Sequence, residues 1–308
     1  MKLLFPALLA STFILSASGE LMPTSAEVFG QKYGSLDNRA TGEWWKRQAP
    51  PKKGRKGMIN LDVPRSEVIG FAVYTLEGST LKMTAQLYPL KPDETQEVRL
   101  EVKQGDQWKE IAKKKIVYPG WSAHFRITDW DGTKDHAYRL RHAEKATFEG
   151  KIRREPTDKE TIVVGNLSCN SSRTTGPRPL IIKNLIAQDP DILFFAGDQT
   201  YHHTQHTSGW LEFGMQFRDI MRDRPTVNVN GATEGSLAED DFLVGSGPVL
   251  RPFVKEFQLA VAEEFESFDV DGFAVVLGIV DVVRARSHFR DGAFGTGFEF
   301  PVFEDGEG

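Results

Sequence analysis

Short stretches in which hydrophobic and polar residues alternate dominate the first half of the chain. Alternation with a period of two is typical of β-strands that bury one face. Turn-forming residues such as Pro92 and Gly132 separate these stretches. Several short strands at this spacing predict an antiparallel β-sandwich. The expected strands are 68–75, 81–88, 98–102, 123–127 and 137–141.

The pattern changes after a second break at 156–160. The segments 161–166 and 192–196 are continuously apolar and rich in β-branched or aromatic residues, which indicates strands buried on both faces. A third strand is expected over 225–229. We expect parallel strands here, because the segments between them have a helical pattern.

Two helices are expected between these strands. The first, 179–188, carries apolar residues at nearly helical spacing and is closed by Asp189 and Pro190. The second, 208–222, is amphipathic, and Ser208 is its expected N-cap. Strand, helix, strand, helix, strand predicts a layered α/β unit that follows an all-β sandwich.

The amino terminus has the pattern of an export signal. Lys2 is followed by an apolar run to Leu15 and then by small residues, where a signal peptidase could cut. We therefore expect a secreted or periplasmic protein with no membrane span after signal removal; an uncleaved anchor is the alternative. The expected organisation is a signal peptide (1–19), a basic linker (20–57), the β-sandwich (58–155), the α/β unit (156–230) and a divergent acidic tail (231–308).

Composition is that of a globular protein with a net charge of −5. This balance gives no signature of nucleic-acid binding. The tail from 231 to 308 holds 5 Lys/Arg and 16 Asp/Glu, a net −11, which leaves +6 for residues 1–230. The chain has 1 cysteine, so an internal disulfide is excluded and Cys169 needs another explanation.

Aromatic residues of the sandwich are expected to have structural roles. Trp121 and Trp130 are interpreted as packing or surface residues rather than a sugar-binding platform. Tyr138, on an alternating stretch, is a candidate for the tyrosine corner of such folds. The histidines of this unit, also expected to be structural or exposed, are His124, His136 and His142.

Candidate chemistry lies where the first two buried strands end. Cys169 follows the first strand, and Asp198 and Tyr201 follow the second. Parallel strands that end side by side would bring the three residues to one edge of the sheet, where open α/β folds bind ligands. A carboxylate and a phenol suit hard cations, and a thiolate suits iron or zinc. We therefore predict a metal site formed by Cys169, Asp198 and Tyr201.

Three histidines, His202, His203 and His206, lie within reach of the same loop and are possible additional ligands or substrate contacts. Two adjacent metals could hold a hydroxide and stabilise in-line displacement at phosphorus. Each feature also has an ordinary explanation, because Gly-Asp is common in turns and a buried cysteine is usually a small hydrophobe. No catalytic residue is assigned, and Arg173 and Arg178 are explained equally well by solvent exposure.

The order of these elements resembles a known family. Leu167-Ser-Cys169-Asn170, followed by Asp189-Pro-Asp and Gly197-Asp-Gln-Thr-Tyr201, is similar to the metallophosphatase domain of PhoD-like alkaline phosphatases. The resemblance covers roughly 58–227 and includes the preceding sandwich, of fibronectin type III kind. It implies that Cys169, Asp198 and Tyr201 bind metal, with calcium and iron the typical ions. The implied activity is hydrolysis of phosphate mono- or diesters, with the phosphate ester as the partner.

The family pattern is lost after Val227. An Asp-Asp-His element is expected there, but the chain continues Asn228-Val-Asn-Gly-Ala-Thr. The abrupt shift to an acidic composition suggests a changed reading frame or a truncated gene, and a genuine divergent extension is the alternative. Coding DNA without an Asp-Asp-His segment in another frame would refute the first interpretation. The α/β unit is therefore expected to be incomplete.

Two further functional hypotheses stay open. The chain is either a phosphoesterase, active or inactive in this form, or a non-catalytic extracellular protein that binds ligands through its β-sandwich. A product that does not fold stably is the third possibility, since a parallel sheet of three strands leaves an edge uncovered. The metal content of the protein separates the first two, and cooperative unfolding argues against the third.

Overall fold

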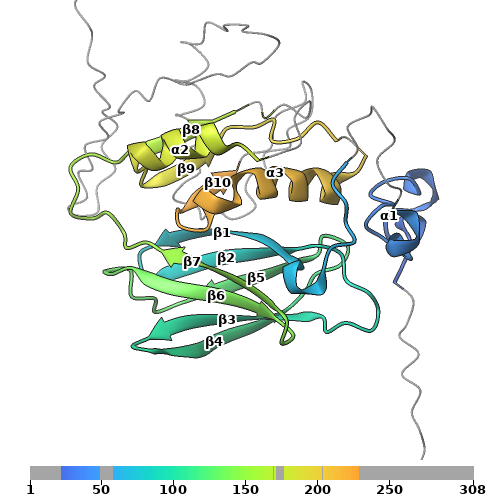
Figure 1. Cartoon of the computed structure of the whole chain (residues 1–308), viewed down its shortest axis with the longest axis horizontal. Helices are drawn as coiled ribbons and strands as arrows, with labels where there is room; N and C mark the ends of the chain where they lie inside the picture. The colour runs from blue at the N-terminus through green and yellow to red at the C-terminus, as the bar shows by residue number, and fades with distance from the viewer. Residues whose placement is uncertain (1–21, 49–57, 169, 171–176, 203, 229–308) are drawn as a thin grey trace, which may run out of the picture.

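The computed structural model describes residues 22–48, 58–168, 170, 177–202 and 204–228. In this part of the chain two antiparallel sheets lie beneath a small parallel sheet with its two helices (Figure 1). Both expected layers, the β-sandwich and the α/β unit, are therefore present. The predicted signal peptide and acidic tail lie outside the described residues and stay predictions.

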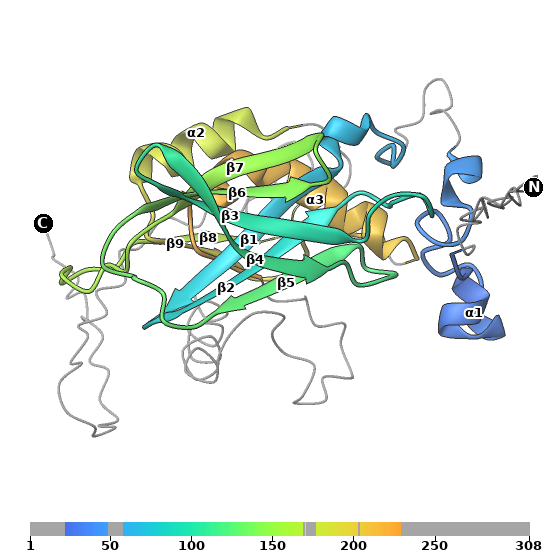
Figure 2. The ribbon, with the colours of Figure 1, turned by 90° about the horizontal axis from the view of Figure 1, so that it is seen from below.

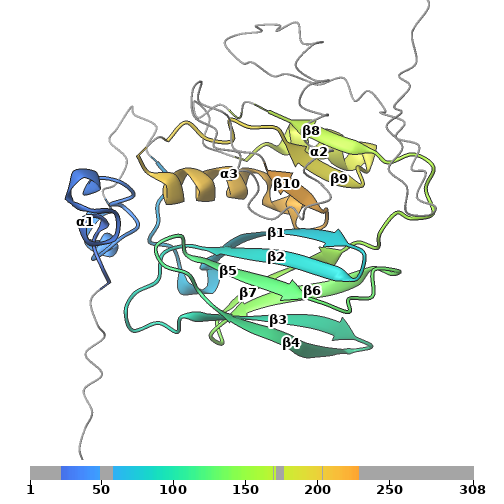
Figure 3. The ribbon, with the colours of Figure 1, turned by 180° about the vertical axis from the view of Figure 1, so that it is seen from behind.

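The sandwich consists of a three-stranded and a four-stranded sheet, which face each other in Figure 3. The first has the order β1-β2-β5, and the second has the order β4-β3-β6-β7. Alternating side chains of the two sheets form the core, as expected for this architecture. The strands are β1 (Ile69–Glu77), β2 (Thr80–Leu87), β3 (Glu97–Gln104), β4 (Gln107–Lys115), β5 (Ser122–Ile127), β6 (His136–His142) and β7 (Ala146–Ile152), and a short 3₁₀ turn, η3 (Arg65–Glu67), precedes them.

Two strands, β4 and β7, were missed by the sequence analysis. β4 is an edge strand on which every residue is exposed or half-buried, and lysines make up much of it. Such an edge carries no apolar stripe, and its lysines discourage pairing with another chain. β7 buries only Ala146, Phe148 and Ile152 in a short alternation. Its place is decided by pairing with β6 rather than by a strong local pattern.

The parallel sheet has the order β10-β9-β8, with β9 in the centre. Its strands follow one another across the sheet, so right-handed crossovers place both helices on one face, and the two helices contact each other. The elements are β8 (Val164–Leu167), α2 (Pro179–Gln188), β9 (Ile192–Phe195), α3 (His206–Met221) and β10 (Thr226–Asn228). The predicted parallel arrangement and the first helix are confirmed.

Helix α3 begins before the position that the sequence analysis assigned. Ser208, the predicted N-cap, lies inside the helix, is fully buried and accepts a hydrogen bond from Arg39 Nη1 at 3.1 Å. The N-cap is Gln205, whose side chain makes no capping bond. Instead, Asp37 accepts the backbone N–H of Thr207 at 3.0 Å and the hydroxyl of the same residue. Asp37, far away in the sequence, therefore accepts one of the N–H groups that the first turn of a helix leaves without a partner.

The sheet β1-β2-β5 is the middle layer, because α3 packs on the face opposite the second sheet (Figures 1 and 3). Burial on both faces explains why the first residues of β1 are apolar without a break. Gly214 of α3 makes the close approach possible, since a Cβ there would lie 2.0 Å from the Phe71 ring. The sandwich and the α/β unit thus share one continuous core.

Residues 22–48 are folded, and the predicted linker over 20–57 is wrong for this part; 49–57 lie outside the described residues. The segment contains α1 (Ser25–Phe29), η1 (Gln31–Tyr33) and η2 (Trp44–Arg47). Trp44 is fully buried and donates to the Leu90 carbonyl at 2.9 Å, while Trp121 donates to Ala40 at 2.8 Å. The residues around Trp44 in the sequence are mostly polar, which is why the segment was predicted to be a linker.

The tyrosine-corner prediction for Tyr138 is wrong. Its ring is fully buried, but its hydroxyl has no hydrogen-bond partner in the part of the chain that the structure describes. Tyr74, whose ring lies edge-on at 6.5 Å, makes the backbone contacts instead. Its hydroxyl donates to the Lys151 carbonyl at 3.1 Å and accepts the Arg153 N–H at 3.0 Å. Tyr74 therefore ties β1 to the end of β7.

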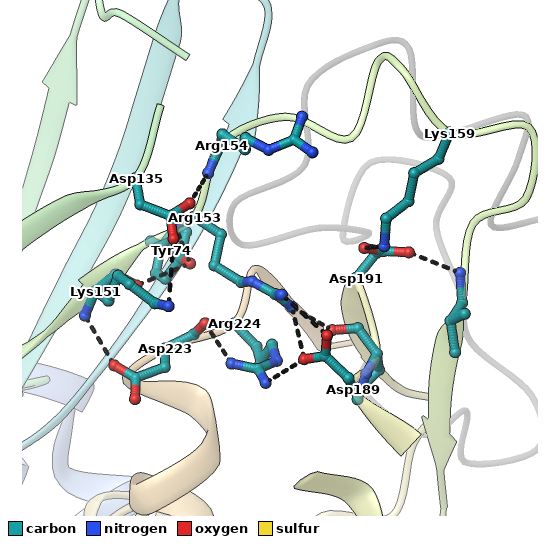
Figure 4. A network of polar contacts seen from close by, with 12 residues as sticks. Tyr74, Asp135, Lys151, Arg153, Arg154, Lys159, Asp189, Asp191, Asp223 and Arg224 are labelled. Carbon is teal, nitrogen blue, oxygen red and sulfur yellow. Dashed lines mark hydrogen bonds and ion pairs between the residues drawn. The ribbon is translucent and has the colours of Figure 1, made fainter. Parts of the chain in front are cut away.

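A polar network joins the end of β7 to the α/β unit (Figure 4). Asp189 is the C-cap of α2. Its carboxylate accepts hydrogen bonds from Arg153 Nη2 at 3.2 Å and from Arg224 Nη2 at 2.7 Å. On the same side, Asp223 accepts the Lys151 backbone N–H at 2.8 Å. Figure 2 shows the sandwich in front of α3, as seen from below. The pairs of Arg153 with Asp189 and of Lys151 with Asp223 cross between the two units. These contacts stabilise the packing of the sandwich against the α/β unit.

The remaining structural expectations for the sandwich hold in this fold. Trp121 is fully buried, and Trp130 is 9% exposed and lies against the His136 ring. His124 and His142 bond to neighbouring strands or turns. Within the described ranges, no helix combines the length and the apolarity needed to cross a bilayer.

Candidate functional site at the carboxyl edge of the parallel sheet

The three parallel strands end at the same level. Leu167 of β8 and Asn228 of β10 are both in register with Phe195 of β9. The loops that follow β8 and β9 therefore leave the sheet side by side, which is the ligand-binding edge of open α/β folds. The backbone N–H of Asn170 donates to the Asp198 carbonyl at 2.9 Å, which joins these two loops directly.

Asp198 and Tyr201 lie together on the loop after β9. The Tyr201 hydroxyl donates to Asp198 Oδ2 at 3.2 Å, and both side chains are exposed. Gly197 has a φ of 120° and Asp198 a φ of 54°, so the chain turns sharply as it leaves the strand. Glycine is the residue that adopts such a turn without strain. The structure thus brings together two of the three predicted metal ligands, whose role as ligands stays a prediction.

The other predicted site residues are placed in three ways. Cys169 and His203 lie outside the described residues. His206 is the exposed first residue of α3, and it opposes the raised pKa that burial gives Asp37. His202 is turned to the helix, with Nε2 at 3.1 Å from Glu212 Oε2. Of the two described histidines, His202 therefore faces Glu212, and His206 is exposed at the start of α3.

A buried polar cluster beneath the loop was missed by the sequence analysis. Asn170 donates through Nδ2 to Gln216 Oε1 at 2.6 Å and to the Gln199 carbonyl at 3.1 Å, and it accepts from Arg178 at 3.0 Å. Gln199 Nε2 in turn donates to the Phe195 carbonyl at 3.1 Å. The signal available in the sequence was the pair Glu212 and Gln216, polar residues one helical turn apart in the predicted helix.

The electrostatics of this cluster follow from burial. Burial raises the pKa of Glu212, while His202, Arg178 and Arg39 act in the opposite direction. Burial also lowers the pKa of Arg178, which the Glu212 charge partly offsets. Glu212 is only 5% exposed. Burial and the neighbouring cationic groups therefore act in opposite directions on the Glu212 carboxyl group, and burial is the larger effect.

The metal-ligand set in the described part of the chain is incomplete. Asp198 and Tyr201 supply two oxygen donors, which match a hard cation in kind. Calcium takes about six to eight oxygen ligands, and the described residues contain no group of three or more His, Cys, Asp or Glu placed to hold a metal ion. The two donors fit a metal by type and do not complete its coordination.

Comparisons with known proteins give only distant likenesses. No family model matches the chain, and no curated protein matches it. A structure of PhoD has a TM-score of 0.45 and 13% identity, over 55% of this chain and 40% of that chain. A cycloisomaltooligosaccharide glucanotransferase from Paenibacillus sp. has a TM-score of 0.26 and 12% identity, over 41% of this chain and 20% of that chain.

A β-glucuronidase from an uncultured Clostridium sp. has a TM-score of 0.21 and 9% identity, over 55% of this chain and 31% of that chain. The chain therefore spans well under half the length of each of these proteins. These likenesses do not assign the chain to a family. Activity, substrate and partners consequently have to be argued from the residues themselves.

Proposed function

We propose that this chain is an exported metallophosphoesterase of the PhoD-like type, which hydrolyses phosphate mono- or diesters. The observation that carries the proposal is the hydrogen bond of 3.2 Å between Tyr201 and Asp198, at the carboxyl edge of a parallel sheet. The resemblance of the segment from Cys169 to Tyr201 to the family motif supports it. Calcium and iron are the ions that this resemblance implies.

In this proposal Asp198 and Tyr201 hold the metal together with Cys169. When bound, metal ions supply Lewis acidity and an activated water for an in-line displacement at phosphorus. The chain positions the ligands: the Gly197 turn directs Asp198 outward, and the Asn170 N–H fixes the Asp198 backbone at 2.9 Å. The loops after β8 and β9 therefore act as one unit at this edge.

The experiment compares hydrolysis of p-nitrophenyl phosphate and its bis-ester by the full chain with calcium and iron added. Asp198→Ala and Tyr201→Phe are the test variants, and Asp106→Ala, in an exposed turn of the sandwich, is the matched control. We expect Asp198→Ala to lose more than about 100-fold in rate, because even outer-shell changes cost roughly 10–100-fold. Equal rates for the wild type and Asp198→Ala would remove this residue from the mechanism.

Metal analysis of the same proteins supplies the second readout. The proposed site is supported if the wild type contains a stoichiometric amount of metal and the Cys169→Ser variant does not. A folded protein that binds no metal and hydrolyses neither ester contradicts it, and favours the alternative of a binding protein that uses its β-sandwich.

A further inference from the structure

The β-sandwich contains a cavity of its own, with a volume of about 390 Å³. It lies between the hairpin of β3 and β4 and the loop that leads into β6, and none of its lining comes from the parallel sheet. Cavities that bind small molecules have volumes of about 300–1,000 Å³. The residues that give it its chemical character are Val102, Lys103, Ile111, Trp130, Lys134 and His136.

The apolar part of the cavity is built by a β-bulge. Val102, at the end of β3, is only 4% exposed. The register between β3 and β4 shifts at Ile111, which has no pairing partner on β3, and Ile111 lines the cavity beside Val102. A bulge turns a side chain away from the direction that regular pairing would give it. The edge strand β4, otherwise rich in lysine, thereby contributes an apolar side chain to the cavity.

The cavity wall also holds a tryptophan N–H without a partner. Trp130 is 9% exposed, and its buried Nε1 makes no hydrogen bond to the residues that the structure describes. The fully buried Trp44 and Trp121, by contrast, donate through Nε1 to backbone carbonyls at 2.9 and 2.8 Å. Since an unpaired buried donor is unfavourable, this wall favours an occupant that carries an acceptor atom.

The Trp130 ring presents no open face to the cavity. The His136 ring packs against it, with the two ring centroids 4.6 Å apart. His136 is itself held by a hydrogen bond of 2.8 Å between its Nε2 and the Asp131 carbonyl. This closed arrangement argues against a sugar stacked on the tryptophan, which would need a free ring face.

The charged side chains at the cavity are all of one sign. Lys103 and Lys134 are both exposed there, and Lys134 also pairs with Asp131 at 2.8 Å. No acidic residue is among the described residues that line the cavity. A cavity with apolar walls and charges of one sign concentrates ions of the opposite sign. The complementary occupant is therefore an anion with an apolar body.

We propose that this cavity is a binding site for a small aromatic carboxylate. Its ring contacts Val102, Ile111 and the edge of Trp130, and its carboxylate lies near the ammonium groups of Lys103 and Lys134. The site belongs to the sandwich, and it does not depend on the proposed hydrolysis at the parallel sheet.

The test titrates the full chain, labelled with ¹⁵N, with 1-naphthoate and follows the indole N–H signals in ¹H–¹⁵N correlation spectra. The chain has 6 tryptophans, and the signal that is missing in Trp130→Phe identifies Trp130. We expect a saturable shift of this signal, while the other indole signals stay in place. 1-Naphthylmethanol, which has the same ring system without the charge, should bind more weakly than 1-naphthoate.

Lysine variants test the role of charge. Lys103→Ala and Lys134→Ala should each weaken the binding of 1-naphthoate by about two- to fivefold, the scale of an exposed ion pair. Neither substitution should change the affinity for 1-naphthylmethanol. Lys109→Ala is the matched control, because this lysine is exposed on β4 and does not line the cavity.

Three results would overturn the proposal. The first is no saturable shift of the Trp130 signal in the wild type, and the second is an equal shift of all indole signals. The third is equal affinity of the wild type for 1-naphthoate and 1-naphthylmethanol, which would remove the anion from the assignment. Asp198→Ala should bind 1-naphthoate as the wild type does, so failure of the proposed hydrolysis would leave this result unchanged.

Discussion

The Asp37 carboxylate accepts the backbone N–H of Thr207, 170 positions later in the chain, at 3.0 Å, so a residue near the amino terminus caps helix α3. Thr207 also donates its hydroxyl to Asp37, and the Asp37 N–H donates to the Thr204 carbonyl at 2.7 Å. Negative charge at this end of a helix is favourable. The amino-terminal segment thus stabilises the helix that carries Glu212.

Replacing Asp37 by alanine should lower the free energy of unfolding by about 1–2 kcal/mol, because loss of an N-cap costs about 0.5–2 kcal/mol. The buried Thr207 hydroxyl would also lose its acceptor. Chemical denaturation measures the change, with Asp106→Ala as the control at an exposed turn. An unchanged midpoint for Asp37→Ala would show that α3 begins without this cap.

Asp37 should also make stability depend on pH. Burial raises its pKa above the ordinary value of 3.8, although Thr207, His206 and Arg39 oppose the shift. The folded state therefore binds more protons than the unfolded state between 3.8 and the raised value. Relative to Asp37→Asn, the wild type should become more stable as pH falls through this window. A wild type that loses stability relative to Asp37→Asn as pH falls would contradict the burial argument.

Tyr74 and Tyr138 should respond in opposite directions to loss of their hydroxyls. Tyr74→Phe breaks bonds to the Lys151 carbonyl and the Arg153 N–H, and we expect a loss of about 1 kcal/mol. Tyr138→Phe removes a buried hydroxyl without a described partner, and we expect a gain of about 1 kcal/mol. Thermal or denaturant unfolding of the two variants checks this, and equal losses would show that the Tyr138 hydroxyl is satisfied in solution.

Gly214→Ala should be strongly destabilising for a conservative change. The new methyl group would lie 2.0 Å from the Phe71 ring, at the contact between α3 and β1. Overpacking of this kind typically costs about 1–3 kcal/mol. Gly34→Ala is the matched control, because its Cβ would meet Ala26 at an ordinary 3.4 Å. Equal unfolding midpoints for the two variants would mean that α3 is not fixed against the sheet.

Asp189 combines two roles that substitution can separate. Its φ of 46° is left-handed, and its carboxylate pairs with Arg153 and Arg224. Alanine and glycine both remove the carboxylate, but only glycine adopts this backbone conformation freely. We expect Asp189→Gly to be more stable than Asp189→Ala by about 1 kcal/mol, the scale of the left-handed penalty. Identical unfolding free energies would show that the cap conformation relaxes.

Local patterns in the sequence predicted much of the secondary structure. The apolar run of β9 and the helix Pro179–Gln188 are strong signals, because burial on two faces or on one helical stripe leaves a continuous or periodic record. The run over 161–166 indicated a strand, but its burial was overestimated, because β8 (Val164–Leu167) is a mostly half-buried edge strand. The meeting of Asp198 and Tyr201 also follows from sequence, since they are separated by one tight turn. The edge strand β4 and the packed segment 22–48 were not predicted. Exposed lysines and polar neighbours leave no alternating or periodic hydrophobic pattern in these segments.

The sequence by itself determined the order of a β-sandwich followed by parallel strands, and the loop on which the candidate ligands lie. Only the tertiary structure decided that Asp37 caps α3, that Tyr74 rather than Tyr138 holds the backbone of β7, and that Glu212 meets His202. The first set depends on neighbours within a few residues, where periodicity and turn chemistry act. The second set joins residues from separate elements, and only the packing of those elements against one another brings them within hydrogen-bond distance.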